Sequence, residues 1–432
     1  MTSDPSNELK ARAARVMPGG VSSNIRLAEG PDAILVRRAR GARVWDEAGR
    51  EYIDYVAGYG AILFGYAPPR LNEALLGALA DGTQFSATNR REIELAEMLV
   101  EAVPSLEMVR FHTTGTETVQ TALRLARAFT ERPTIVKFRR HYHGWLIAAD
   151  AALPAADGEA DRELFPNNAS PPVVTLPWDD FAAAERALRR HASRIAGVIT
   201  EPLMANHGGH EAASGYLKRL RALCQELGIL FILDEVITGF RLGLGGAQGY
   251  YGLRPDLTSF GKALGSGLPI GAVGGRRDIM ALIGDGRVNH SGTYNGNALS
   301  MAAGHWTLGT LKRAGACFYD GLFARGRALM AGLARAAAAA GTAVILRGPG
   351  PVFWLAFERD EGVKSALPAG TKPPLEPPLY RRFRLAMQAD GVRLMPGGRW
   401  YVTDAHSNAD IHATVERARQ AFAELAETRA DA

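Results

Sequence analysis

The chain has 432 residues, of which 47% are hydrophobic, and its 50 basic and 45 acidic residues give a formal net charge of +5. This length and apolar content can bury a large core in two or three domains, or in one large domain with a small companion, and they exclude a tail or linker protein. The basic residues occur in scattered pairs rather than in one stripe, which argues against nucleic-acid binding.

The chain shows no sign of secretion or membrane insertion. Its first 20 residues lack the apolar centre of a signal peptide, and the longest apolar run, residues 336–346, is too short to cross a bilayer. Cys224 and Cys317 each stand alone in an apolar stretch, so we expect both to be buried and to form neither a disulfide nor a metal site. We therefore expect a cytoplasmic protein.

In chain order, the first predicted element is a hairpin, in which residues 42–46 and 52–55 flank a turn at residues 47–50. From about residue 70 to 320, helical patterns alternate with short apolar runs, which is typical of a mostly parallel sheet covered by helices. The predicted strands are residues 108–111, 135–138, 195–199, 229–233 and 257–260, and the predicted helices include 117–129 and 216–227.

After residue 310 the pattern changes. An alanine-rich helical segment leads to a predicted strand at residues 352–357, a proline-rich connection at 368–378 and further helix. The sequence therefore predicts an α/β protein with an N-terminal arm and hairpin (residues 1–70), a large domain with a mostly parallel sheet (71–320) and a smaller C-terminal α+β domain (321–432).

In an open parallel sheet, ligands bind beyond the carboxyl ends of the strands, so the residues after each apolar run are candidates for a site. The run at 108–111 leads to His112, two threonines, Gly115 and Thr116, and then to a helix. Backbone N–H groups and the positive end of the helix dipole would make this turn a seat for a phosphate. An ordinary helix start with Thr116 as the N-cap residue explains the same sequence equally well.

The run at 135–138 leads to Tyr142, whose ring is placed to stack on a flat heterocycle, with His141 and His143 nearby as hydrogen-bonding groups. Two histidines alone do not predict a metal site, because no further ligands stand at a metal-site spacing. We therefore expect no metal.

Asp234 and Lys262 carry the strongest chemical signal. Asp234 follows a fully apolar run, and a carboxylate in that position needs a cation or a strong donor such as a protonated pyridine nitrogen. Lys262 directly follows another apolar run and is surrounded by glycines, where partial desolvation would leave its amine free to attack an aldehyde. These residues predict amino-group chemistry, with Lys262 carrying pyridoxal phosphate as a Schiff base.

An apolar run followed by Asp234 and Glu235 also resembles the magnesium-binding strand of ATPases. That interpretation requires a phosphate loop of the form G-x-x-x-x-G-K-[ST]. The chain has one Gly-Lys pair, ending at Lys262, and Asp256 and Ala263 occupy the positions of the first glycine and of the hydroxyl residue. The nucleotide interpretation therefore fails.

Six motifs occur in a characteristic order: TGTE at 114–117, YHG at 142–144, EP at 201–202, DEVITGFR at 234–241, GK at 261–262 and GTYNGN at 292–297. This set resembles the class III aminotransferases, which have fold type I and use pyridoxal phosphate (PLP). The branch it resembles contains glutamate-1-semialdehyde 2,1-aminomutase and amino-acid aminotransferases such as D-phenylglycine aminotransferase. The resemblance runs from about residue 15 to the C-terminus and implies a large PLP-binding domain with a smaller C-terminal domain.

The resemblance also implies a role for each matching residue. Lys262 would hold the cofactor, Asp234 would pair with its pyridine nitrogen, and Tyr142 and Val236 would lie on the two faces of its ring. The phosphate would be bound by Gly115 and Thr116 and, from the partner subunit of a homodimer, by Thr293.

The substrate would be an amino acid. Arg26, at the end of the segment 18–26, is similar to the arginine that this branch presents to a substrate carboxylate, and its planar fork matches that group. We add Tyr59 and Glu201 as candidate substrate-binding residues. Further candidates to line the pocket are Asn206, His207, Arg399 and Trp400.

The implied reaction is a ping-pong transfer of an amino group from an amino acid, alpha or beta, to a keto acid, with Lys262 as the proton shuttle. An aminomutase of the glutamate-1-semialdehyde type or an amino-acid racemase is the alternative. Residues 150–172 lack a glycine- and serine-rich gate and residues 395–401 lack a glutamate, which speaks against the mutase. The alternative of another class is a catalytically idle PLP-binding module, but the presence of both Lys262 and Asp234 favours an active enzyme.

Overall fold

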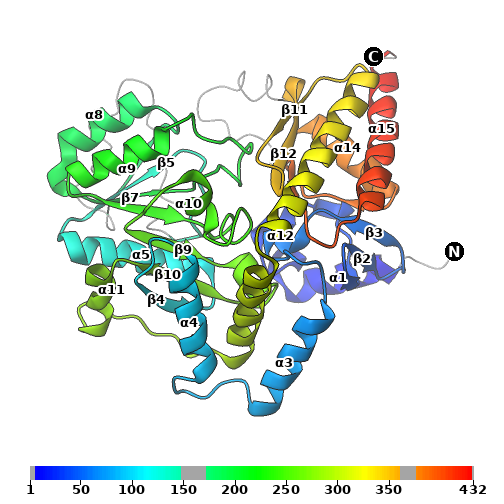
Figure 1. The fold of residues 1–432 in the computed structure, drawn as a ribbon. Coiled ribbons are helices and arrows are strands. Elements are labelled where there is room, and N and C mark those ends of the chain that lie inside the picture. The colour runs from blue at the N-terminus through cyan, green and yellow to red at the C-terminus, as the bar shows by residue number, and fades with distance from the viewer. Residues whose placement is uncertain (1–4, 147–171, 361–375, 431–432) are drawn as a thin grey trace. The chain divides into compact units, whose positions relative to one another are not determined.

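The computed structural model describes residues 5–146, 172–360 and 376–430 (Figure 1). They form two compact units, one made by residues 69–319 and the other by residues 1–68 together with 320–432. Each unit contains sheets and helices of its own.

The unit of residues 69–319 is built on a seven-stranded sheet in the order β4-β10-β9-β8-β7-β5-β6. In this sheet β10 runs antiparallel to β4 and β9, and the other pairs are parallel. The predicted α/β class with a mostly parallel sheet is therefore confirmed, and so are the predicted strands. The sequence does not predict the strands β6 and β10. The strands are β4 (Met108–His112), β5 (Thr134–Phe138), β6 (Val173–Leu176), β7 (Ile195–Thr200), β8 (Leu230–Asp234), β9 (Leu257–Phe260) and β10 (Gly271–Gly275).

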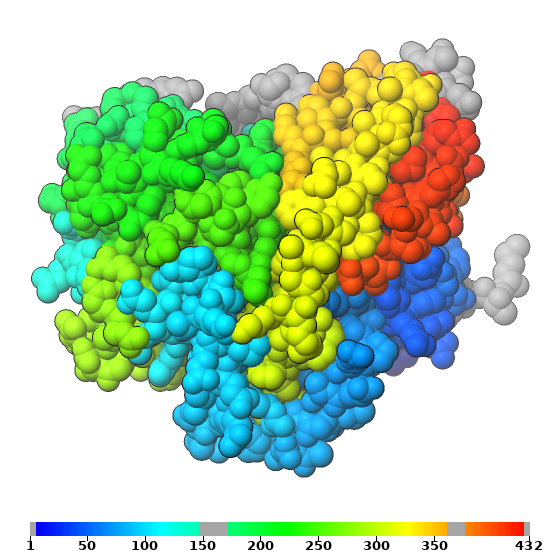
Figure 2. Space-filling model, in the orientation of Figure 1, coloured from blue at the N-terminus to red at the C-terminus, as the bar shows by residue number. Residues whose placement is uncertain are grey.

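Different helices cover the two faces of this sheet. On one face α5 and α11 pack in a buried cluster with Ile135 and Ile232. On the other face α8 and α9, side by side in green in Figure 2, pack with Val136 and Phe231. Because successive strand residues point to opposite faces, both faces need apolar side chains, and the strands read as continuous apolar runs. The helices of this unit are α3 (Pro69–Asp81), α4 (Arg90–Ala102), α5 (Gly115–Thr130), α8 (Phe181–His191), α9 (Tyr216–Glu226), α10 (Gly246–Tyr251), α11 (Arg277–Gly284) and the first part of α12 (Ala298–Ala339), which is interrupted at Gly315.

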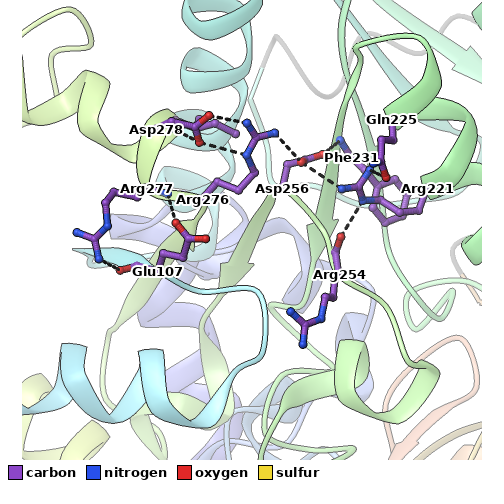
Figure 3. A network of polar contacts seen from close by, with 10 residues as sticks. Glu107, Arg221, Gln225, Phe231, Arg254, Asp256, Arg276, Arg277 and Asp278 are labelled. Atoms are coloured by element: carbon purple, nitrogen blue, oxygen red, sulfur yellow. Dashed lines mark hydrogen bonds and ion pairs between the residues drawn. The ribbon is translucent and has the colours of Figure 1, made fainter.

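At the amino ends of the strands, Asp256 is the centre of a polar network (Figure 3). Its Oδ2 accepts a hydrogen bond from the backbone N–H of Phe231 in β8 at 2.8 Å. Its Oδ1 accepts from Arg276 at 3.1 Å and from Arg221 at 3.3 Å. Since Asp256 directly precedes β9 and is 3% exposed, this carboxylate ties the starts of β8 and β9 together inside the protein.

The other unit brings the two ends of the chain into one sheet of order β1-β2-β3-β13. The antiparallel pair β2–β3 confirms the predicted hairpin, and β13 adds to β3 in parallel. In a second sheet, β11-β12-β14, Phe357 of β12 contacts Phe383 of α14 and Phe422 of α15. The elements of this unit are α1 (Pro5–Val16), α2 (Asn24–Leu27), β1 (Val36–Arg40), β2 (Arg43–Asp46), β3 (Glu51–Asp54), β11 (Val344–Arg347), β12 (Val352–Phe357), α14 (Pro378–Ala389), β13 (Val392–Arg393), β14 (Arg399–Tyr401) and α15 (Asn408–Ala430).

In the part of the chain that the structure describes, no helix is both long and apolar enough to cross a membrane. Cys224 is buried as predicted, but the same prediction is wrong for Cys317, which is exposed. Cys317 lies on α12 beside the buried Phe318. Neighbouring helix positions point about 100° apart, so an apolar run does not bury each of its members.

Candidate active site

A cavity of about 220 Å³ lies beyond the carboxyl ends of the seven-stranded sheet, within the unit of residues 69–319. It brings together seven predicted site residues: Gly115, Thr116, Tyr142, Glu201, Asp234, Val236 and Lys262. The cavity is also lined by Val119, His143, Gly144, Leu203, Asn206, Ile237 and Thr238. The turns that follow β4, β5, β7, β8 and β9 all contribute to it.

Asp234 is the last residue of β8 and is 6% exposed. Its Oδ2 accepts a hydrogen bond from Nδ1 of His143 at 2.7 Å, and its Oδ1 accepts from the backbone N–H of Val236 at 3.1 Å. His143 is itself buried, and its Nε2 has no hydrogen-bond partner among the described residues. The carboxylate is thus fixed by two donors, which offset part of the cost of its burial.

Glu201 lies near this pair, at the end of β7. One carboxylate oxygen accepts from the backbone N–H of Tyr142 at 2.7 Å, and both oxygens lie 3.3 Å from the side-chain nitrogen of Asn206. Burial raises the pKa of Glu201 to about 7, with His143 acting to lower it and Asp234 acting to raise it. Glu201 therefore changes its charge near neutral pH, next to the Asp234–His143 pair.

The turn between β4 and α5 starts the helix with a capping box, in which the Thr114 hydroxyl accepts from the Glu117 N–H and the Glu117 carboxylate accepts from the Thr114 N–H. The N-cap residue is Thr114, so the predicted Thr116 cap is wrong, because the helix begins two residues earlier than that cap requires. Gly115 and Thr116 instead form the first turn, whose N–H groups lack acceptors within the helix. Both line the cavity.

Two glycines allow the loops of this site to approach closely. A Cβ atom on Gly115 would lie 2.8 Å from Cγ1 of Val236. A Cβ atom on Gly144 would lie 2.7 Å from the hydroxyl oxygen of Thr116, and Gly144 also has a φ of +88°. The loops after β4, β5 and β8 therefore meet at distances that a larger residue would prevent.

Lys262 follows β9 across Gly261 and opens a short 3₁₀ turn, Lys262–Gly265. Its φ is +45°, a left-handed conformation that is unfavourable for residues other than glycine. Such backbone conformations are concentrated at functional sites, where the surrounding structure holds them. Lys262 contributes to the same cavity as Asp234 and Thr116.

Three predicted site residues do not line this cavity in the described part of the chain. Thr293 lies on an exposed loop, where its carbonyl oxygen accepts a hydrogen bond from the side chain of Gln84. Arg26 on α2 and Tyr59 belong to the unit of residues 1–68 and 320–432. Tyr59 has a φ of +57°, and its hydroxyl donates to Glu29 at 3.4 Å. The roles given to these three residues stay predictions.

Of the other pocket candidates, Asn206 lines the cavity, and His207 is absent from its described lining. Arg399 and Trp400 are buried in the other unit. The predicted lack of a gate in residues 150–172 falls almost entirely outside the described residues. Among those that are described, no group of three His, Cys, Asp or Glu side chains is placed to hold a metal ion.

The sequence does not single out His143 as the partner of Asp234, although it lies in the YHG motif. His143 lies five residues after the end of β5, outside the strand, so strand alternation does not indicate where its side chain points. Thr238, four residues after Asp234, also lines the cavity and has no separate signal in the sequence.

The chain is similar to known proteins over almost its whole length. The Aminotransferase class-III family model matches residues 27–418. The chain is 38% identical to a glutamate-1-semialdehyde 2,1-aminomutase of Desulfatibacillum aliphaticivorans, across 98% of this chain and 100% of that protein. It is similar in structure to an omega-transaminase from Sphaerobacter thermophilus, with a TM-score of 0.87 and 32% identity over 99% of this chain and 98% of that one. A transaminase with PLP bound also has a TM-score of 0.87, with 29% identity over 99% of both chains.

Proposed function

This chain belongs to the class III aminotransferases, and we therefore propose that it moves an amino group from an amino acid to a keto acid in two half-reactions. Its cofactor is PLP. The observation that carries the proposal is the meeting of Lys262, Asp234 and the turn of Gly115 and Thr116 around one cavity.

The chemistry of these residues fits the cofactor. A pyridine nitrogen that must stay protonated needs a carboxylate, and Asp234 offers one that His143 and a backbone N–H hold in place. A phosphate needs N–H donors, and the first turn of α5 presents them at Gly115 and Thr116. An aldehyde forms a Schiff base with a primary amine, and Lys262 provides that amine.

When bound, PLP supplies an electron-poor ring that accepts the electron pair left when the substrate carbon next to nitrogen loses its proton. We assign the movement of that proton to Nζ of Lys262, the lysine of the cavity. Asp234 keeps the ring nitrogen protonated, and His143 keeps the carboxylate of Asp234 in place. Tyr142 and Val236 also line the cavity and would lie against the ring.

We further propose that Arg26 and Tyr59 take part in substrate binding. Arg26 carries the planar charge that suits a carboxylate, and the positive φ of Tyr59 is a local strain of the kind found at binding sites. Glu201 would form the polar wall of the substrate side of the cavity, together with Asn206.

We also propose a cytoplasmic homodimer in which Thr293 reaches the phosphate of the partner subunit. Thr293 and its neighbour Tyr294, which is 66% exposed, lie on a loop that Gln84 and Asn89 hold through its carbonyl groups. This loop is thus ordered by its own chain while it presents its side chains outwards. The free cysteines support a reducing compartment.

An aminomutase is the second candidate, favoured by the 38% identity across 98% of this chain to a protein of that name. Aminotransfer and amino migration use the same two half-reactions, so the residues of the cavity serve both. The two candidates differ in whether the intermediate carbonyl compound leaves.

Absorbance of the purified holoenzyme distinguishes them. An aminotransferase should lose the visible band of its lysine-bound cofactor when an amino acid is added alone, and recover it when a keto acid follows. A mutase should instead isomerise glutamate-1-semialdehyde without any second substrate and leave amino acids unchanged. A protein that shows no visible band with PLP would contradict both proposals.

A further inference from the structure

Glu235 directly follows Asp234, but its side chain enters the protein interior instead of the cavity and is completely buried. One oxygen accepts from the backbone N–H of Ala247 at 2.5 Å and from the Thr238 hydroxyl at 3.4 Å. The other accepts from the backbone N–H of Gln248 at 2.9 Å and from its side-chain nitrogen at 3.1 Å. Four donors thus converge on one carboxylate.

The hydrogen bonds around Glu235 require a carboxylate, and no side chain of similar shape can replace it. All four partners are donors in these bonds, so the group between them must accept at both of its oxygens. A glutamine would place its own N–H₂ against two of the donors in either orientation of its amide. Space is also fixed, because a Cβ atom on Gly246 would lie 2.6 Å from the nearer oxygen of Glu235.

The contacts of Glu235 reach the strand that leads to Lys262. The side-chain nitrogen of Gln248 also donates to the hydroxyl of Thr258 in β9 at 3.2 Å. The backbone N–H of Glu235 donates to the carbonyl of Ser259, in the same strand, at 2.9 Å. Gln248, Thr258 and Ser259 are all fully buried. Glu235 therefore connects the end of β8, which bears Asp234, to the strand that ends just before Lys262.

We propose that Glu235 is a positioning residue that fixes the turn of Asp234 and Val236 against the strand of Lys262, so that these side chains meet the cofactor together. The inference rests on the proposed function. Asp234 and Val236 are the direct chain neighbours of Glu235. A turn that is anchored at Glu235 therefore holds the carboxylate of Asp234 and the side chain of Val236 in place.

Asp256 supplies a matched control. It is also a buried carboxylate that joins β8 and β9, but at their amino ends, through Phe231, Arg276 and Arg221 (Figure 3). β8 is a five-residue strand. At about 3.3 Å per residue the two carboxylates are therefore separated by most of the strand length. Loss of either should destabilise the sheet, but Glu235 alone should affect the cofactor.

The test compares full-length Glu235→Gln, Gln248→Met and Asp256→Asn proteins with the wild type. For each apoprotein the dissociation constant of PLP is measured by absorbance titration, at a temperature at which near-UV circular dichroism shows all four folded. The pH midpoint of the visible band is then measured for each holoenzyme. Gln248→Met removes the side-chain donor to Glu235 and Thr258 while it keeps the carboxylate, so it provides the answer if Glu235→Gln does not fold.

We expect Glu235→Gln to weaken PLP binding about tenfold, which corresponds to ~1.4 kcal/mol, and to move the pH midpoint of the band. Gln248→Met should cause a smaller loss in the same direction, and Asp256→Asn should bind PLP as the wild type does despite a lower melting temperature. Wild-type affinity and pH midpoint in Glu235→Gln and Gln248→Met would overturn the inference, and so would an equal loss in Asp256→Asn. A wild-type protein that does not bind PLP would instead refute the proposed function.

Discussion

Nδ1 of His143 lies 2.7 Å from Oδ2 of Asp234, and both side chains are buried at the edge of the same cavity. Because the carboxylate accepts, the hydrogen on His143 is placed on Nδ1, and the carboxylate is held in one orientation. The contact joins the turn after β5 to the end of β8, two strands that are separated by β7 in the sheet. The orientation of Asp234 therefore depends on a loop distant in sequence.

His143→Ala should weaken PLP binding, because it removes a charge-assisted hydrogen bond of about 1.5–3 kcal/mol. This corresponds to a loss of about 10- to 150-fold in affinity. In a double-mutant cycle with Asp234→Asn, the two losses should overlap, since each variant breaks the same contact. Titration of the four apoproteins with PLP measures both. Additive losses would show that His143 does not act through Asp234.

Glu201 should make the stability of the apoprotein depend on pH. Burial raises its pKa from the usual 4.5 to about 7, so its favourable contribution is complete below pH 4.5 and is lost as the pH rises through 7. Relative to Glu201→Gln, the wild type should lose up to roughly 3 kcal/mol of unfolding free energy between these values. Urea unfolding of both proteins from pH 4.5 to 8 measures this difference. A constant difference over that range would contradict the assigned shift.

Gly115→Ala should reduce affinity for PLP by about tenfold, because the added Cβ atom pushes Val236 out of the cavity wall, a rearrangement of about 1–3 kcal/mol. Gly249→Ala is the matched control, since Gly249 lies in α10 with no atom within 4 Å of an added Cβ. The control should keep its affinity, and its melting temperature should be unchanged or slightly raised. Equal affinities in the two variants would contradict the close packing at Gly115.

Thr293→Asp and Lys262→Ala should each abolish activity alone and complement each other when mixed. The hybrid dimer has one site with Lys262 from one subunit and Thr293 from the other. If the subunits exchange at random, half of the dimers are hybrids. Each hybrid has one intact site of two, so about a quarter of the wild-type activity should return. Thr293→Ser should stay active, because it keeps the hydroxyl. An inactive mixture, in which gel filtration shows that subunits have exchanged, would refute a shared site.

The cavity residues that follow apolar runs could be predicted from the sequence for a geometric reason. The carboxyl ends of parallel strands share one edge of the sheet, so Asp234 and Lys262 meet whatever their separation in the chain. Contacts within the protein interior cannot be predicted from this shared edge. Glu235 follows Asp234 in the same motif, but its role depends on the N–H groups of Ala247 and Gln248, which stand 12 and 13 positions later in the chain.

The strand β10 illustrates a second limit. Three of its five residues are glycine, a composition that argues against a strand. The packing explains these glycines, because a Cβ atom on Gly271 would lie 2.6 Å from Thr118, and one on Gly275 would lie 2.1 Å from the carbonyl oxygen of Asp256. Here the tertiary structure overrides local preference. The pairing of β13 with β3 likewise joins residues about 340 positions apart, and no local pattern marks it.

The proposed attachment of PLP to Lys262 can be tested chemically. Borohydride reduction of the purified holoenzyme makes such a linkage permanent, and digestion followed by mass spectrometry then locates the pyridoxyl group. We predict that the visible band disappears on reduction and that the label lies on Lys262, with no label in Lys262→Ala. A label on another lysine of the wild type, or an unlabelled protein, would contradict the attachment of PLP to Lys262.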